Sequence, residues 1–263
     1  MFLFGYQYLD KGYAERINLP APPENVNIID EYIAAMDRAM VARNEISALE
    51  GKTDITELTA WPSDTEIQKQ VGLVLTMYPA RAVPIKLVQF KPKRTLRRMG
   101  ISGIYNPFTG EANVESNLPS IQNAYVSAHE MAHAHGITSE AEANFVAYLA
   151  CLNSGDPFLI YAGEYALWRQ VAREINKTFP KDVLESLRAM APEDLWTDRI
   201  AILNIYRQSP AYFPEATENM NDAYLKLQGI EAGADDYDGF LKIYLAWKEK
   251  YLSKTEPLLQ KNG

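Results

Sequence analysis

The chain has 263 residues, of which 47% are hydrophobic, and this is enough to bury a substantial core in one globular domain. Its formal charge of −8 argues against nucleic acid as the main partner, and its single cysteine excludes an intrachain disulfide framework. No apolar run reaches the roughly 18 to 20 residues that a membrane-spanning helix needs.

The first 23 residues are expected to form an N-terminal segment that precedes a single domain over residues 24–263. Residues 1–9, MFLFGYQYL, are apolar and aromatic, yet they lack the charged start and the cleavage site of a signal peptide. Pro20, Pro22 and Pro23 then interrupt the chain. One interpretation of the opening is an ordinary segment that docks on the core.

The region before residue 116 is expected to combine two helices with three short strands. Apolar residues at helical spacing predict helices over residues 25–49 and 64–77. Alternating apolar residues and turn residues predict strands over 83–90, 100–105 and 110–115. A basic run between the first two strands is interpreted as a solvated loop, with a contact to anionic lipid as the alternative; it holds Lys91, Lys93, Arg94, Arg97 and Arg98.

All three histidines of the chain lie within residues 129–135. His129 and His133 frame a glutamate in an H-E-x-x-H sequence, and the Ala-rich stretch around them, free of Pro and Gly, predicts a helix. Residues i and i+4 share a helix face, so both imidazoles can bind one zinc ion. Glu130 then lies beside the metal, where it can take a proton from a zinc-bound water. The alternative is a pair of surface histidines satisfied by hydrogen bonds.

A catalytic zinc usually takes a third protein ligand. Cys151 is the only cysteine and sits in an apolar run, where a buried thiol is the better interpretation. His135 is two residues from His133, about 200° around the helix, which nearly excludes it. The remaining candidates are three glutamates: Glu140, Glu142 and Glu164.

We place the third ligand at Glu142, with Glu140 as the second choice. A helix is expected to start at Thr138 or Ser139, and on it Glu142 shares a face with Val146 and Leu149. Its side chain should therefore turn inward. The alternative is local, because Ser-x-x-Glu at a helix start is also a capping box.

Beyond residue 155 the chain is expected to be nearly all helix, so that residues 24–155 hold the strands and the metal-site helices and residues 156–263 form a helical part. Helices are predicted over 157–176, 180–190, 192–208, 214–228 and 237–252. The predicted fold class is α+β and helix-dominated, with the metal between two consecutive helices.

The sequences HEMAHAHG and EAEANFVAYLAC, preceded by IYNPFTGEANV, resemble a bacterial family catalogued as domain of unknown function 3810, which is grouped with gluzincin-like metallopeptidases. The resemblance is densest over residues 99–165. It implies a zincin-like fold. The H-E-x-x-H and E-A-N elements also resemble those of a separate group of bacterial zinc proteases that cleave regulators, and that resemblance implies the Glu of E-A-N, Glu142 here, as third ligand. His135 departs from the family pattern, where Gln is expected. Members generally carry transmembrane helices, so residues 1–9 are interpreted as the end of a membrane anchor missing from this chain.

In zinc peptidases of this kind, a strand before the metal helix lines the cleft and pairs with the substrate. The resemblance therefore assigns substrate binding to the strand residues Glu111, Ala112, Asn113 and Val114, with an ordinary internal strand as the alternative. A donor to the transition-state oxyanion stays unassigned, and the tyrosines considered are Tyr105, Tyr161, Tyr165 and Tyr237.

The expected function is hydrolysis of peptide bonds with one zinc ion, on a peptide or protein substrate. The alternative is an inactive zinc-binding domain that senses or scaffolds at a membrane. Both readings share the same ligands, and they differ in whether Glu130 faces a site open to water.

Overall fold

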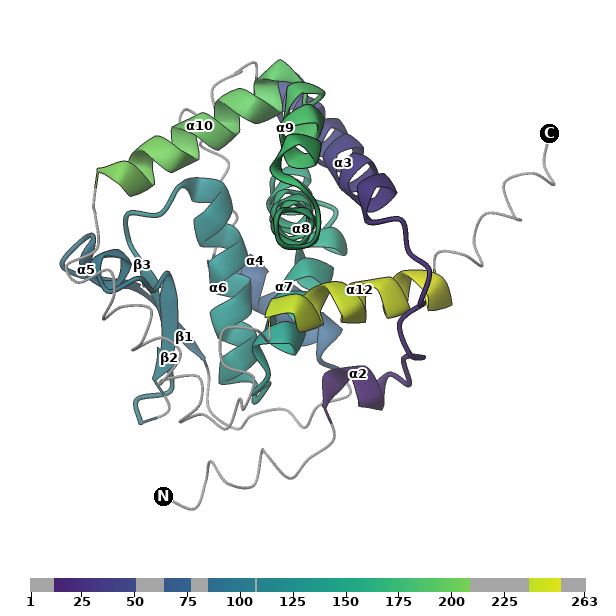
Figure 1. The fold of residues 1–263 in the computed structure, drawn as a ribbon. Helices are drawn as coiled ribbons and strands as arrows, with labels where there is room; N and C mark the ends of the chain where they lie inside the picture. Colours follow the sequence, from purple (N-terminus) through teal and green to yellow (C-terminus); the bar gives the residue numbers. More distant parts are fainter. Residues whose placement is uncertain (1–11, 51–63, 77–84, 107, 209–236, 252–263) are drawn as a thin grey trace.

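In a computed structural model of the chain, residues 12–50, 64–76, 85–106, 108–208 and 237–251 are described. This part is dominated by helices and has one three-stranded sheet, which confirms the expected α+β class (Figure 1). None of the helices in these ranges combines the length and hydropathy needed to cross a bilayer. The helix expected over 214–228 and the proposed anchor residues 1–9 lie outside the described residues.

The sheet has the order β1-β3-β2. Strand β1 (Lys86–Phe90) runs parallel to β3 (Glu111–Glu115), and β2 (Gly103–Asn106) pairs with β3 in the antiparallel direction. The hairpin between β2 and β3 turns at Gly110, whose φ of +71° favours glycine. Strand β3 is therefore the central strand and is bonded on both edges.

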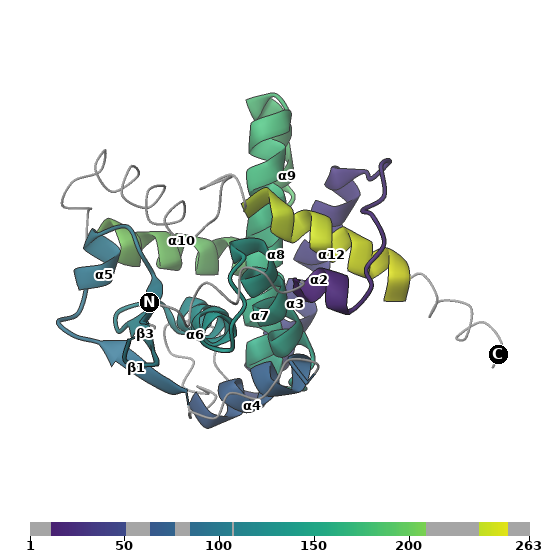
Figure 2. The same ribbon diagram turned by 90° about the horizontal axis from the view of Figure 1, so that it is seen from below.

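The core lies where helix α6 (Ser120–Ala134) packs between the sheet and helix α7 (Glu140–Leu152), and Figure 2 shows α6 between them. Ala124, Ala128 and Ala132 recur at every fourth position of α6 and are at most 1% exposed. Such small buried side chains let neighbouring helices pack closely against α6. The face of α6 that meets the start of α7 carries Tyr125, His129 and His133.

The remaining helices surround this pair. The long helix α8 (Pro157–Thr178) packs against α6 and α7, and it also packs against α3 (Ile28–Glu50). The others are α2 (Tyr13–Arg16), α4 (Asp64–Val74), α5 (Thr95–Arg98), α9 (Lys181–Ala189), α10 (Glu193–Arg207) and α12 (Tyr237–Tyr251). All the predicted helices and strands that fall on described residues are present, with ends shifted by a few residues.

The basic run is not simply a solvated loop. Its second half forms α5, in which Arg97 is only 5% exposed and donates to the backbone oxygen of Asn117 over 3.0 Å. The buried carboxylate of Glu115, at the end of β3, accepts hydrogen bonds from the backbone N–H groups of Arg94 and Arg97. These contacts fix α5 against the central strand, because a buried carboxylate needs donors.

Three helices are joined by a buried ion pair. Arg43 of α3 and Asp198 of α10 are 3% and 1% exposed and form two hydrogen bonds, of 2.6 and 3.1 Å. The Tyr161 hydroxyl of α8 donates to the same carboxylate over 2.7 Å. Asp194, one turn before Asp198, also lies 3.4 Å from Arg43, but its side chain is 55% exposed.

We expect the Asp198→Ala variant to lose about 3–5 kcal/mol of unfolding free energy, because it leaves the Arg43 guanidinium buried without its partner. The matched control is Asp194→Ala, which removes an exposed contact to the same arginine and should cost under about 1 kcal/mol. Urea unfolding followed by circular dichroism measures both values. Equal losses in the two variants would contradict this account of the pair.

Candidate metal centre

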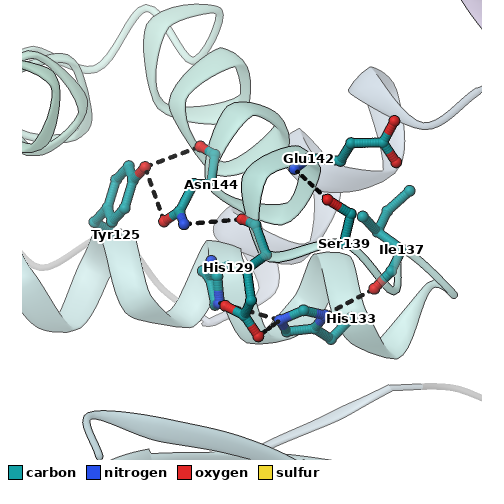
Figure 3. Close-up of polar contacts among 8 residues, drawn as sticks. Tyr125, His129, His133, Ile137, Ser139, Glu142 and Asn144 are labelled. Carbon is teal, nitrogen blue, oxygen red and sulfur yellow. Dashed lines mark hydrogen bonds and ion pairs between the residues drawn. The ribbon is translucent and has the colours of Figure 1, made fainter. Parts of the chain in front are cut away.

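The end of helix α6 positions His133. His135 is the C-cap, and Gly136, with a φ of +104°, reverses the chain. The N–H groups of Gly136 and Ile137 return to the carbonyls of His133 and Ala132 over 2.9 and 3.1 Å, a Schellman motif. The turn carries the Ile137 carbonyl back to the imidazole of His133, whose Nδ1 lies 2.7 Å away (Figure 3). With its proton on Nδ1, His133 presents a bare Nε2 to the site.

Three ligand atoms meet beside this turn. The Nε2 atoms of His129 and His133 lie 3.1 Å apart. The carboxylate of Glu140 reaches both, with one oxygen 3.2 Å from Nε2 of His129 and the other 3.3 Å from Nε2 of His133. The structure therefore brings the two histidines together, as their spacing predicted, and adds Glu140 as the carboxylate. These residues form the three-ligand cluster.

The three side chains of the cluster lie close enough together for one metal ion to contact all of them. Zinc bonds of about 2.0–2.1 Å in a tetrahedron place neighbouring ligand atoms roughly 3.3 Å apart. The two Nε2 atoms are 3.1 Å apart, and each lies 3.2 or 3.3 Å from a different oxygen of Glu140. One ligand atom from each of the three residues lies within 4.8 Å of the other two. A pair of imidazoles and one carboxylate is also a donor set that zinc takes in catalytic sites.

One hydrogen bond links α7 to α6, and two others hold the start of α7 internally. Asn144 donates its side-chain N–H to the backbone oxygen of Glu140 over 2.8 Å. Tyr125, one turn before His129 on α6, donates its hydroxyl to the backbone oxygen of Asn144 over 2.9 Å (Figure 3). Ser139 caps the helix by accepting the N–H of Glu142 over 3.3 Å. Glu140 thus enters the three-ligand cluster from a turn whose backbone is held in place.

Glu142 does not take the place beside the histidines that its sequence position predicted. Its carboxylate accepts the backbone N–H of Ala14 in α2 over 3.0 Å, and Figure 3 shows it directed away from His129 and His133. Two residues on a helix differ by about 200°, so Glu140 and Glu142 face opposite sides of α7. The carboxylate next to the histidines is that of Glu140, the second choice of the sequence argument.

Glu130 lies between the histidines and the sheet. It is 5% exposed, and a Cβ placed on Gly103 of β2 would lie 2.6 Å from its Oε1. Burial raises the pKa of Glu130, as does the charge of Glu140, while the two histidines and a backbone hydrogen bond from Tyr105 lower it. The net pKa is raised from its ordinary value, which suits a group that accepts and returns a proton near neutral pH.

The same cluster is strongly charged. Burial lowers the pKa of the His133 imidazole, but the charge and hydrogen bond of Glu140 outweigh it and raise the pKa to about 9. Burial raises the pKa of Glu140, but both histidines hold it well below its ordinary range. In the absence of a metal, His133 and Glu140 therefore form an ion pair at neutral pH.

The other residues considered from the sequence lie elsewhere. Glu164, 1% exposed, accepts hydrogen bonds from Arg38 and the Tyr148 hydroxyl, of 2.9 and 3.1 Å, within the helical core. The Tyr161 hydroxyl is bonded to Asp198. Tyr165 packs its ring against Trp168 and Tyr161, and Cys151 is buried. The side chain of Tyr237 lies outside the described residues.

The predicted substrate strand is corrected by the sheet order. Glu111, Ala112, Asn113 and Val114 belong to β3, which pairs with β1 on one side and with β2 on the other. A strand bonded on both edges has no free backbone groups for an added strand. Within the described part of the chain, β2 pairs only with β3, and it is β2 that touches Glu130.

A family model described as a protein of unknown function, DUF3810, matches residues 1–245. The chain belongs to this family. No curated protein and no solved structure matches the chain significantly.

Four residues of the site were missed by the sequence argument. Tyr125 lies four residues before His129, and this spacing was a usable signal for a shared helix face. Asn144 stands in the E-A-N element, but its bond to the Glu140 backbone needs the observed helix start. Gly103 and the Ile137 carbonyl carried no usable signal, because their roles depend on the contact of β2 with α6 and on the turn after α6.

We expect the metal-free protein to lose stability as the pH rises from about 6.5 to about 9. The pKa of His133 is raised from 6.5 to about 9 in the fold. Its protonation therefore stabilises the fold fully below pH 6.5, and this stabilisation is lost as the pH rises through about 9. The loss should reach roughly 3 kcal/mol. Urea unfolding in a chelator at several pH values measures it. Glu140→Gln removes the charge that raises the pKa, and the idea fails if this variant keeps the full slope.

Proposed function

We propose that this protein is a zinc-dependent hydrolase and, more specifically, a metallopeptidase. The observation that carries the proposal is the three-ligand cluster of His129, His133 and Glu140, with atoms 3.1–3.3 Å apart, beside the buried carboxylate of Glu130. The bond from His133 Nδ1 to the Ile137 carbonyl supports it, since zinc-bound histidines commonly donate their second ring N–H to such an acceptor.

The residues divide into two roles. His129, His133 and Glu140 would hold the metal. When bound there, zinc would supply a Lewis acid that polarises a substrate carbonyl and makes water more acidic. Glu130 accepts a proton from the attacking water at its carboxylate and passes that proton to the leaving amine. Its raised pKa and its burial favour this role.

A polypeptide substrate is supported by the position of β2. This strand has one neighbour in the described sheet, and Gly103 brings its backbone against the side chain of Glu130. A chain in extended conformation can add to such an edge through main-chain hydrogen bonds. Its scissile bond would then run past Glu130. In this proposal the substrate therefore pairs with β2 instead of β3.

We expect the purified protein to bind about one zinc ion per chain. His129→Ala and Glu140→Ala should lose it, because each leaves two ligands. Glu142→Ala is the matched control, because it removes a carboxylate two residues from Glu140 that does not reach the histidines. This variant should still bind zinc at saturation. Elemental analysis measures the content. Zinc retained by Glu140→Ala but lost by Glu142→Ala would reverse the assignment.

We expect Glu130→Gln to keep its zinc and lose hydrolysis of unfolded polypeptide by about 10²–10⁴-fold, because the amide is nearly the same size but accepts no proton. The assay follows the cleavage of a fluorescently labelled casein by zinc-loaded protein. Glu111→Gln, on the sheet and 29% exposed, is a control that should retain activity. Equal rates for wild type and Glu130→Gln would sink the proposed role of Glu130.

One observation favours an inactive zinc-binding domain as the second candidate. The side chains of His129, His133 and Glu140 are only 13, 11 and 9% exposed, which restricts access by a large substrate. In that case wild type and Glu130→Gln bind zinc equally, and neither cleaves any substrate. The two experiments above therefore separate metal binding from catalysis.

A further inference from the structure

The contact of Glu142 joins the chain's N-terminal part to the helix that carries Glu140. Glu142 Oε1 accepts the N–H of Ala14 over 3.0 Å, at the first turn of α2. Gly12 lies directly against the same carboxylate: an added Cβ would overlap Oε1 and lie 3.1 Å from the side-chain Cδ of Glu142. The φ and ψ of Gly12, −60° and 164°, suit any residue. Glycine is needed here for the close approach to Glu142 and not for backbone conformation.

Helix α2 is held at its other end as well. Lys250 of α12 donates its ammonium group to the backbone oxygens of Ile17 and Asn18 over 2.7 and 3.0 Å. A carboxylate at the N-terminal end and an ammonium at the C-terminal end both complement the peptide dipoles of the helix. Tyr13, 4% exposed, packs its ring 6.2 Å from that of Phe145 on α7. The short helix is thus docked on α7 by its two ends and its buried ring.

The first turn of α7 is consequently held from two sides. On the side of α6, the Tyr125 hydroxyl donates to the backbone oxygen of Asn144, and the Asn144 side chain in turn donates to the backbone oxygen of Glu140. On the opposite side, Glu142 holds α2. The Ser139 hydroxyl accepts the backbone N–H of Glu142, and the side-chain carboxylate of Glu142 makes the long-range contact to Ala14. A shift of Glu142 rotates the same helical turn that directs Glu140 into the three-ligand cluster.

We propose that Glu142 is a positioning residue that couples docking of the N-terminal helix α2 to the geometry of the metal centre. The inference rests on the proposed metal site and adds a means of regulating it. Displacement of α2 by a change in the preceding chain frees Glu142, loosens the first turn of α7 and weakens the hold of Glu140 on the metal. Supporting residues around metal ligands commonly change metal affinity by about 10–100-fold.

The first test compares two glycine variants. Gly12→Ala pushes a methyl group into Glu142, whereas a Cβ added at Gly72, on α4, meets no atom within 4 Å. Zinc affinity is measured by competition with a chromophoric chelator, and the ligand geometry by the visible spectrum of the cobalt-substituted protein. Gly12→Ala should weaken zinc binding by about 10-fold and alter the cobalt spectrum, and Gly72→Ala should do neither.

The second test replaces Glu142 itself. Glu142→Gln keeps an acceptor oxygen for the Ala14 N–H and should bind zinc within about 2-fold of wild type, while Glu142→Leu removes the acceptor and should behave like Gly12→Ala. This pair has similar side-chain volumes, so a general loss of packing would affect both. Hydrogen exchange of the Ala14 amide should become faster only in Glu142→Leu and Gly12→Ala.

The outcomes separate the two proposals. If wild type binds zinc but Gly12→Ala and Glu142→Leu bind it as tightly and keep its cobalt spectrum, the positioning role of Glu142 is overturned and the metal site stands. If wild type binds no zinc, the proposed function fails and the coupling fails with it. If Glu142→Gln bound zinc as weakly as Glu142→Leu, the hydrogen bond to Ala14 could not be the cause of the coupling, and the proposal would be overturned.

Discussion

The close contact between α6 and α7 is the constraint on which the site depends. The Tyr125 hydroxyl of α6 donates to the backbone oxygen of Asn144 and links the two helices next to His129. At this separation one carboxylate of α7 reaches both imidazoles of α6.

The charges at this contact explain why the arrangement suits a cation. Two imidazole nitrogens 3.1 Å apart need a proton or a metal between them and a nearby negative charge, and Glu140 supplies that charge. The raised pKa of His133 reports the same field. A metal ion bound at the proposed site would displace this proton from His133.

Polar contacts between distant parts of the chain join the outer helices to one another and to α7. Arg43 and Asp198 join α3 to α10, and Glu142 joins α7 to α2. In both cases a charged group is buried or half-buried with its partner, and the partner lies over a hundred positions away in sequence. Such pairs fix how helices are arranged relative to one another more than they add stability, because desolvation offsets much of their attraction.

Much of this molecule was determined by sequence pattern alone. Helical spacing of apolar residues located the longer helices over described residues, because burial repeats with the period of the helix, but it did not locate the four-residue helices α2 and α5. The four-residue separation of His129 and His133 placed both on one face for the same reason. Local turn chemistry at Gly136 ended α6, since a positive φ favours glycine.

Only the tertiary structure showed that Glu140, and not Glu142, lies beside the histidines. It also showed that β2, and not β3, is an edge strand of the described sheet. Both glutamates suit the first turn of α7, and they face opposite sides, so the choice required knowing that α2 covers one side and α6 the other. Likewise, strand propensity identifies strands but not their order, which depends on pairing across distant sequence. The sequence by itself determined the local periodicities and placed His129 and His133 on one helix face, because both depend only on spacing along the chain. The packing of distant segments determined which glutamate lies beside the histidines and which strand lies against Glu130.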